Sequence, residues 1–183
     1  MKLRWLSLVV ALQAAWLVGT ALTAQNGLVT GRVIRLETRP VDPRDLLRGD
    51  YLTLAYDFSR IPLESFAPPL PVSPALAPGS TIYVELAPDG EFYRMTNVTF
   101  LRPRVPEGHV ILRGKSGPLQ DPRRSLEGGL PVEFGLERFY VREGTGNPQG
   151  KLTVDVSVSK TGIGTIREVY LDGVPYAEAM AGR

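Results

Sequence analysis

Hydrophobic and polar residues alternate along much of the chain after residue 26. The clearest case is 151–159, where Leu or Val occupies every even position from 152 to 158 and most of the intervening residues are polar. A period of two is typical of a half-buried β-strand. Residues 81–86 alternate in the same way, and Pro88, Asp89 and Gly90 then lead into a second run over 91–101. This arrangement predicts a β-hairpin.

Shorter runs of the same kind bring the expected strands to about eight. They cover 28–38, 51–58, 109–113, 130–138 and 165–171, and the glycines within 160–164 predict a second hairpin that joins 151–159 to 165–171. Short strands separated by turn signals favour an all-β fold, either an antiparallel sandwich or a partly closed barrel.

Three further segments do not have the strand pattern. Proline crowds residues 61–79, which therefore predict a long surface loop, and a second irregular stretch covers 114–129. Residues 175–181 are long enough for two turns of helix at the C-terminus. Neither loop divides the chain, so residues 26–183 are expected to form one domain.

The N-terminal residues have a different character. Lys2 and Arg4 precede an apolar stretch over 6–22 that contains only three polar residues. This layout is typical of a signal peptide or a signal anchor, and about 17 apolar residues can just span a bilayer. We expect residues 1–25 to be an uncleaved anchor helix, with 26–183 exported to the exterior or periplasm. The alternative is cleavage after Ala24, which would release the domain.

Composition excludes several classes of function. The 183 residues include no cysteine and a single histidine, His109, so disulfides, zinc ribbons, iron–sulfur clusters and multi-histidine metal sites are not expected. The 21 basic and 19 acidic residues give a net charge of +2, which provides no strong field for nucleic acid. We therefore expect no metal, no cofactor and no nucleic-acid partner.

Two stretches of mixed charge are the candidate site. Residues 42–49 have the aspartate, proline and glycine positions of one short helical turn, and a core strand follows. The charged residues of this first set are Asp42, Arg44, Asp45, Arg48 and Asp50, and those of the second set are Glu137, Arg138, Arg142 and Glu143. Our hypothesis is that the sets meet, with Arg44 or Arg48 bound to Glu137 or Glu143, because arginine's planar fork suits carboxylates. The alternative is that each set is a solvated turn.

The first stretch carries a motif with a name. Gly49, Asp50, Tyr51, Leu54 and Tyr56 fill every fixed position of Gly-Asp-Tyr-x-x-Leu-x-Tyr, so the chain resembles the GDYXXLXY proteins. Residues 135–146 are similar to the second signature of that family and include Tyr140, Glu143 and Gly144, although Arg142 stands where proline is more common. The resemblance implies a bacterial envelope protein with one hydrophobic N-terminal segment and a β-rich exported domain. It also implies a gene that often lies beside that of a multi-pass membrane protein, and it brings no catalytic residues.

Two functions follow from these observations. The preferred one is a non-catalytic protein tethered to the bacterial inner membrane, whose exported domain docks onto a multi-pass membrane partner. The rival is an enzyme or small-ligand receptor with a groove between 42–56 and 137–146. The rival requires a concave pocket into which Asp50, Tyr51, Glu137 or Tyr140 project.

Overall fold

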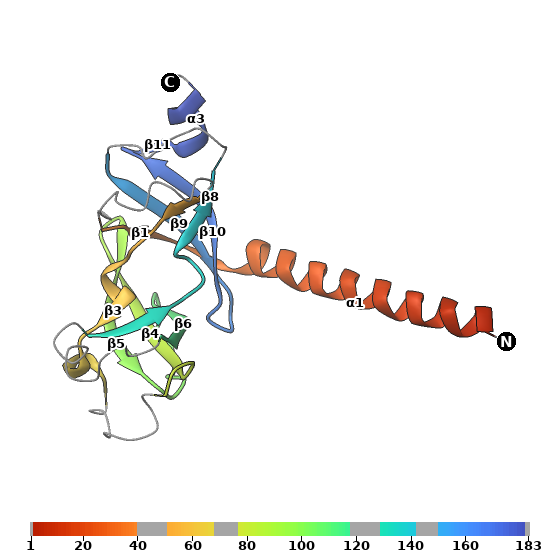
Figure 1. Ribbon diagram of the computed structural model, residues 1–183. Helices are drawn as coiled ribbons and strands as arrows, with labels where there is room; N and C mark the ends of the chain where they lie inside the picture. The colour runs from red at the N-terminus through yellow and green to blue at the C-terminus, as the bar shows by residue number, and fades with distance from the viewer. Residues whose placement is uncertain (1, 40–50, 68–76, 118–128, 142–149, 182–183) are drawn as a thin grey trace.

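A computed structural model describes residues 2–39, 51–67, 77–117, 129–141 and 150–181. The chain begins with helix α1 (Lys2–Thr30), which leads away from a β-rich body (Figure 1). The helix ends at Thr30 and strand β1 (Arg32–Glu37) begins two residues later, so the strand expected from residue 28 starts four residues later than predicted. Gly27 costs only about 1 kcal/mol within a helix, and the helix ends before Gly31, since glycine is common directly after the last residue of a helix.

The apolar character of α1 was the basis for the expected anchor. Within the described part of the chain, no helix is both long enough and apolar enough to cross a membrane.

Two larger antiparallel sheets make up most of the body. The first has the order β1-β9-β10-β11 and contains β9 (Leu152–Val158), β10 (Gly164–Leu171) and β11 (Val174–Pro175) in addition to β1. The second has the order β3-β7-β6-β4-β5, with β3 (Arg60–Ile61), β7 (Leu130–Glu133), β6 (Val110–Ser116), β4 (Thr81–Asp89) and β5 (Phe92–Thr99). Both predicted hairpins, β4–β5 and β9–β10, are confirmed.

A two-stranded sheet pairs β2 (Tyr51–Thr53) with β8 (Arg138–Tyr140). The remaining elements are the 3-10 helices η2 (Asp57–Ser59) and η3 (Leu63–Ser65) and helix α3 (Tyr176–Ala181), which agrees with the helix expected over 175–181. The described fold is thus mostly β with antiparallel sheets, as predicted, and the sheets are not closed.

Other predicted segments also differ from the structure. The run 130–138 is divided between β7 of the five-stranded sheet and β8 of the two-stranded sheet, because Gly135 adopts a φ of 78° between them. The run 51–58 is a strand only as far as Thr53 and ends in η2. The expected loop over 61–79 contains η3, after which Phe66 forms a bridge to Val98 at the outer edge of β5.

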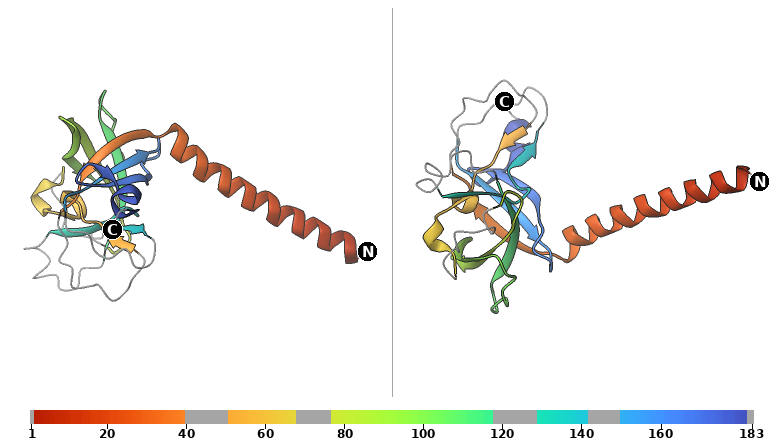
Figure 2. Two further views of the ribbon diagram at one scale, coloured as in Figure 1. Left: turned by 90° about the horizontal axis from the view of Figure 1, so that it is seen from above. Right: turned by 60° about the horizontal axis from the view of Figure 1, so that its bottom comes forward.

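One hydrophobic core unites the sheets. It contains buried residues of the four-stranded sheet, such as Leu36 and Val156, and of the five-stranded sheet, such as Val84 and Leu112. Leu54 and Leu136, which flank the β2–β8 pair, belong to the same core. The views in Figure 2 show the β-rich body at one end of α1, with no other element packed along most of the helix.

Candidate functional site

The two motif stretches lie side by side through the pairing of β2 with β8. Tyr51 is opposite Tyr140, Leu52 opposite Phe139, and Thr53 opposite Arg138. The contact continues beyond the strands, because the backbone N–H of Leu54 donates a 2.8 Å hydrogen bond to the carbonyl oxygen of Glu137. The described parts of both motifs therefore lie side by side, and they meet through the backbone.

Most residues of the proposed ion pair lie outside the described part of the chain, and so does the helical turn predicted over 42–49. The candidate residues outside it are Asp42, Arg44, Asp45, Arg48, Gly49, Asp50, Glu143 and Gly144. The pairing of Arg44 or Arg48 with Glu137 or Glu143 stays a prediction.

The last tyrosine of the first motif is a buried hydrogen-bonding residue. Tyr56 is 1% exposed, and its hydroxyl donates a 3.0 Å hydrogen bond to the carbonyl oxygen of Leu136. Its ring stacks on Phe58 at a centroid distance of 5.3 Å, and Phe58 meets Phe134 edge-on at 5.1 Å. Burial, and then the nearby charge of Glu137, raise the pKa of Tyr56 well above its usual value. The hydroxyl thus stays protonated and serves as a donor.

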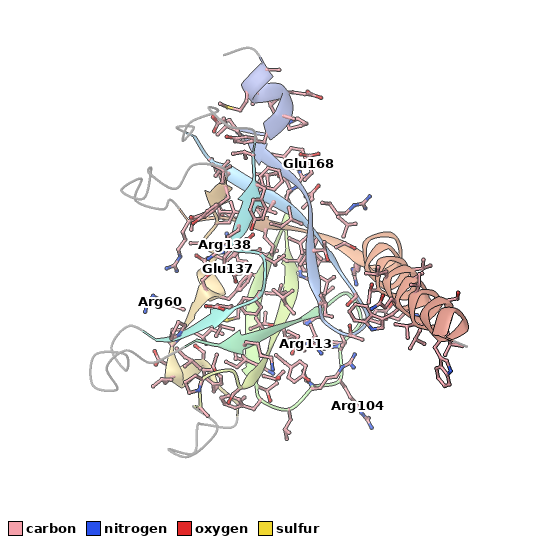
Figure 3. The ribbon with its side chains drawn as sticks, turned by 45° about the vertical axis from the view of Figure 1, so that its right-hand side comes forward. Arg60, Arg104, Arg113, Glu137, Arg138 and Glu168 are labelled. Atoms are coloured by element: carbon pink, nitrogen blue, oxygen red, sulfur yellow. The ribbon has the colours of Figure 1, made fainter. Side chains whose placement is uncertain are left out.

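Glu137 closes the turn that precedes β8. Its carboxylate accepts a 2.5 Å hydrogen bond from the backbone N–H of Phe134, three residues earlier. Gly135 lies within this turn at positive φ, a conformation that glycine adopts at little cost. The Glu137 side chain therefore stabilises a local turn, and Figure 3 shows it close to Arg138 in the body of the domain.

The outer face of the β2–β8 pair carries aromatic and cationic side chains. The Arg138 guanidinium carbon lies 5.3 Å from the centre of the Tyr51 ring, a cation–π contact. The Tyr51 and Tyr140 rings meet edge-on at 6.1 Å. Tyr140 is 72% exposed, so this face offers an aromatic surface to the solvent or to a partner.

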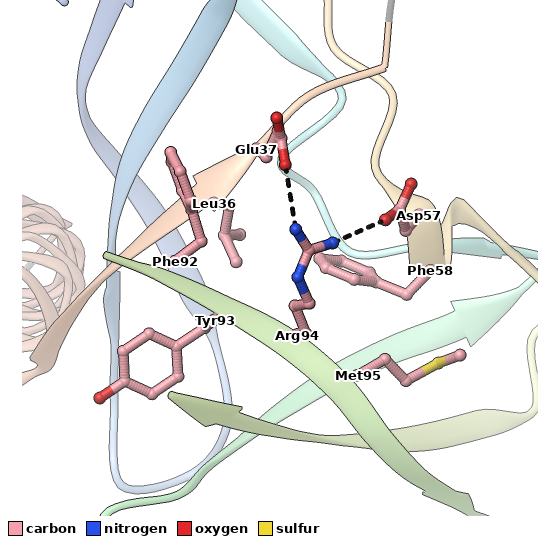
Figure 4. A pocket seen from close by; sticks show the side chains of 8 residues that line it. All are labelled: Leu36, Glu37, Asp57, Phe58, Phe92, Tyr93, Arg94 and Met95. Atoms are coloured by element: carbon pink, nitrogen blue, oxygen red, sulfur yellow. Dashed lines mark hydrogen bonds and ion pairs between the residues drawn. The ribbon is translucent and has the colours of Figure 1, made fainter. Parts of the chain in front are cut away.

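A small pocket lies on another part of the domain. It is lined by Leu36, Glu37, Asp57, Phe58, Phe92, Tyr93, Arg94 and Met95, and its cavity volume is about 20 Å³ (Figure 4). This volume suffices for about one water molecule. Tyr51, Glu137 and Tyr140 are absent from its lining, so it is not the groove that the rival function requires.

Charges around this pocket are paired with one another. Arg94 lies 2.7 Å from Asp89, 3.5 Å from Glu37 and 3.8 Å from Asp57, measured between guanidinium nitrogens and carboxylate oxygens. The side chains are half-exposed to exposed, and exposed pairs contribute about 0–1 kcal/mol each. Sequence reasoning missed this cluster because its members come from four separate segments.

Two more polar contacts were not foreseen. Arg35 binds Asp155 through two hydrogen bonds of 2.7 Å and 2.9 Å, which hold the pKa of the Asp155 carboxyl below its usual value, and Tyr170 donates to the same carboxylate at 3.1 Å. His109 places Nδ1 2.6 Å from the carboxylate of the nearly buried Glu85. Within the described ranges, no three His, Asp or Glu side chains group together as metal ligands would.

Comparison with known proteins gives one match. A family model described as GDYXXLXY protein matches residues 13–169. No curated protein and no solved structure matches the chain.

Proposed function

This chain belongs to the GDYXXLXY family, and we propose that it is a non-catalytic envelope protein. In this proposal α1 holds the β-rich domain at the bacterial inner membrane, and the domain docks there onto a multi-pass membrane protein. The chain would need no cofactor and no nucleic acid for this role.

The observation that carries the proposal is the exposed apolar surface of α1. Large apolar side chains stand out from the helix at residues Trp5, Leu8, Val9, Val10, Leu12, Trp16, Leu17 and Val18, each 48–71% exposed. These positions are distributed around the helix, and they do not form the single stripe of a helix that packs on its own domain. A helix that is apolar all round is stable when lipid or other apolar helices cover it. Both would be available beside a multi-pass membrane protein.

A structural role for the motif favours a non-catalytic protein. Leu54 and Tyr56 are buried, the Tyr56 hydroxyl has its partner in Leu136, and the Glu137 carboxylate is occupied by a backbone N–H. An active site needs groups that are free to meet a substrate, in a concave pocket. We also infer that the two larger sheets form a sandwich, which the core shared between them supports.

The outer face of the β2–β8 pair is the docking surface that we propose for the partner. Tyr140, Tyr51 and Arg138 lie there, and tyrosine and arginine are residue types that dominate binding at protein interfaces. Tethering helps such a contact, because two surfaces confined to one membrane have a raised effective concentration.

The membrane part of the proposal is tested by fractionation of cells that produce the full chain. We expect the protein in the membrane fraction after alkaline carbonate washing and its release by detergent. Replacement of two apolar residues of α1, Val9→Arg with Leu12→Arg, should shift it to the soluble fraction, since the two charges oppose burial of this exposed apolar surface against lipid or other apolar helices. The control is Val174→Arg on β11, where valine is 44% exposed. A soluble wild-type chain that begins after Ala24 would contradict the tether and indicate cleavage.

The partner part is tested by crosslinking in cells. A photoreactive residue at position 140 should capture one membrane protein, whereas the same residue at position 64, on η3, should not. The pair Tyr140→Ala and Arg138→Ala should reduce co-purification in mild detergent without changing the melting temperature. Recovery of an uncrosslinked monomer from intact cells, at both positions, would refute docking through this face.

A further inference from the structure

The end of the domain from which α1 departs carries a surface with the chemistry of a lipid contact. We propose that this surface binds the anionic headgroups of the membrane in which α1 is held. We call it the α1-side surface, and it consists of Val33, Leu101, Arg102, Arg104, Val105, Lys160 and Ile163. The inference rests on the proposed function, since it assumes that α1 brings the domain to a membrane.

Hydrogen bonds place the segments of this surface together. Arg32, just after α1, is opposite Val158 at the end of β9, and the β9–β10 turn follows at once. In that turn the carbonyl oxygen of Lys160 accepts a hydrogen bond from the Arg102 guanidinium. The carbonyl oxygen of Gly162 accepts a 2.7 Å bond from the backbone N–H of Arg113 on β6. The β9–β10 turn therefore joins the end of α1 to the 100–105 segment.

Exposed apolar side chains are concentrated on this surface. Outside α1, six large apolar side chains of the described residues are exposed, and four belong to it. Leu101 is 79% exposed, Ile163 48%, Val105 46% and Val33 43%. Leu101 and Ile163 come from different segments that the Arg102–Lys160 bond links. Scattered apolar side chains are ordinary, but a group on neighbouring segments beside the end of an apolar helix indicates an interaction site.

Cations surround these apolar residues. Arg102, Arg104 and Lys160 are exposed, and among the described residues none of them forms an ion pair with an acidic side chain. Some cations elsewhere are paired with carboxylates, as Arg35 is with Asp155 and Arg94 is with Asp89. Glu107 is the acidic residue of this region. Figure 3 shows Arg104 and Arg113 toward the side from which α1 leaves, whereas Arg60 lies on the opposite side.

Anionic lipid is the occupant that this combination favours. Lys and Arg near a membrane surface attract anionic headgroups, and apolar side chains between them enter the boundary of headgroups and acyl chains. Because the surface is continuous with the end of α1, the tether would bring it to the headgroups without a further partner. A protein partner would use the same location with acidic side chains, and the test below separates the two.

The absence of cysteine allows a direct test on the full chain. A single cysteine is introduced as Ile163→Cys, labelled with the polarity-sensitive dye NBD, and the protein is reconstituted into vesicles. One set of vesicles contains phosphatidylcholine alone, and the other contains phosphatidylcholine with phosphatidylglycerol. We expect a blue shift and quenching by spin-labelled lipid in the anionic vesicles only. The matched control is Glu64→Cys, whose dye should stay in water in both.

Charge removal then tests the cations. With Arg102→Gln, Arg104→Gln and Lys160→Gln combined, the equilibrium constant for contact of this surface with the anionic membrane should fall roughly 100-fold, because each cation raises that constant about fivefold. Ionic strength of about 1 M, which shortens the screening length to about 3 Å, should also weaken contact of the surface with the anionic vesicles. Arg60→Gln, on the opposite side, should leave the signal unchanged.

Several outcomes would overturn the inference. These are a dye at position 163 that stays in water in anionic vesicles, an equal shift in neutral vesicles, and a shift that survives the triple substitution. A signal that appears only when native membrane proteins are added would assign the surface to a protein. A chain that does not sediment with vesicles at all would instead contradict the proposed tether, so the two failures are distinguishable.

Discussion

Replacement of Tyr56 by phenylalanine tests whether the motif serves the fold. The substitution keeps the ring that stacks on Phe58 and removes only the hydroxyl that donates to the Leu136 carbonyl oxygen. Leu136 is 0% exposed, so its carbonyl oxygen would lose this buried donor. A net hydrogen bond contributes about 0.5–1.5 kcal/mol, and an unsatisfied buried acceptor costs about 1–3 kcal/mol. We expect Tyr56→Phe to lower the free energy of unfolding by about 1–2 kcal/mol.

The assay is denaturation of the full chain in mild detergent, followed by circular dichroism. A change of this size should lower the melting temperature by about 2–8 °C for a domain of this length. The control is Tyr140→Phe, since Tyr140 is 72% exposed and should change stability by less than about 0.5 kcal/mol. Equal stability of Tyr56→Phe and the wild type, with loss of partner binding, would refute the structural interpretation and assign the hydroxyl a functional role.

The same residue predicts an alkaline limit of stability. The pKa of Tyr56 is raised in the folded protein, because burial opposes the charged phenolate. An unfolded chain ionises this tyrosine near its ordinary value of 10.0, while the folded chain does not. Its contribution to stability is therefore complete below pH 10 and is lost as the pH rises from there toward the folded pKa. Part of the alkaline destabilisation should disappear in Tyr56→Phe, as a comparison of urea curves at about pH 9 and pH 11 would show.

Three other substitutions have definite expected results. Leu54→Ala should destabilise the fold by about 2–5 kcal/mol in urea denaturation, whereas the exposed Thr53→Ala should change it by less than about 0.5 kcal/mol. Asp155→Asn should cost about 1.5–3 kcal/mol at neutral pH through its lost bonds to Arg35. Because the pKa of Asp155 is lowered in the folded protein, the stability that its carboxylate contributes is present above pH 3.8 and is lost as the pH falls below that value. Asp155→Asn should therefore lose less stability than the wild type when the pH is lowered. Gly162→Ala should lower the melting temperature, because φ is +87° and the new Cβ would lie 3.0 Å from a backbone oxygen of β6; an unchanged value would contradict the tight turn.

Strands with an unbroken period were predictable from the sequence. β9 has the bounds of the alternating run 152–158, and its hairpin with β10 follows from the glycines between them. The prediction that β9 is half-buried was wrong, since Thr153 and Ser157 on its polar face are also buried. The run 130–138 was not predictable in the same way, since its pattern of apolar and charged residues does not show where the chain changes sheets. Its one signal was Gly135, whose positive φ redirects the chain.

For the site, only the proximity of the two motif stretches could be predicted from the sequence. Opposite charges in two stretches suggested that they come together, and β2 and β8 do pair. The pattern did not show that the described contact would be made by backbone groups and tyrosines. The contacts of Arg94 with Glu37 and Asp57, and the pair of Glu85 with His109, left no local signal, because each joins segments that are distant in the sequence.

The three fixed positions of the motif that the structure describes have a common physical explanation in the junction of β2 with β8. Tyr51 lies outside and meets Tyr140 across the pair, Leu54 fills the core, and Tyr56 ties the strand to the turn before β8. Neighbouring side chains of a strand point to opposite faces, so the x position Leu52 is buried in the core whereas the x position Thr53 is exposed. A catalytic or ligand-binding motif would hold polar groups in a cavity, whereas the described residues of this motif are held in place by burial and strand pairing. Substitutions here should therefore act first on stability, and loss of partner binding should follow the fraction of unfolded protein, except at the docking-surface residues Tyr51, Arg138 and Tyr140.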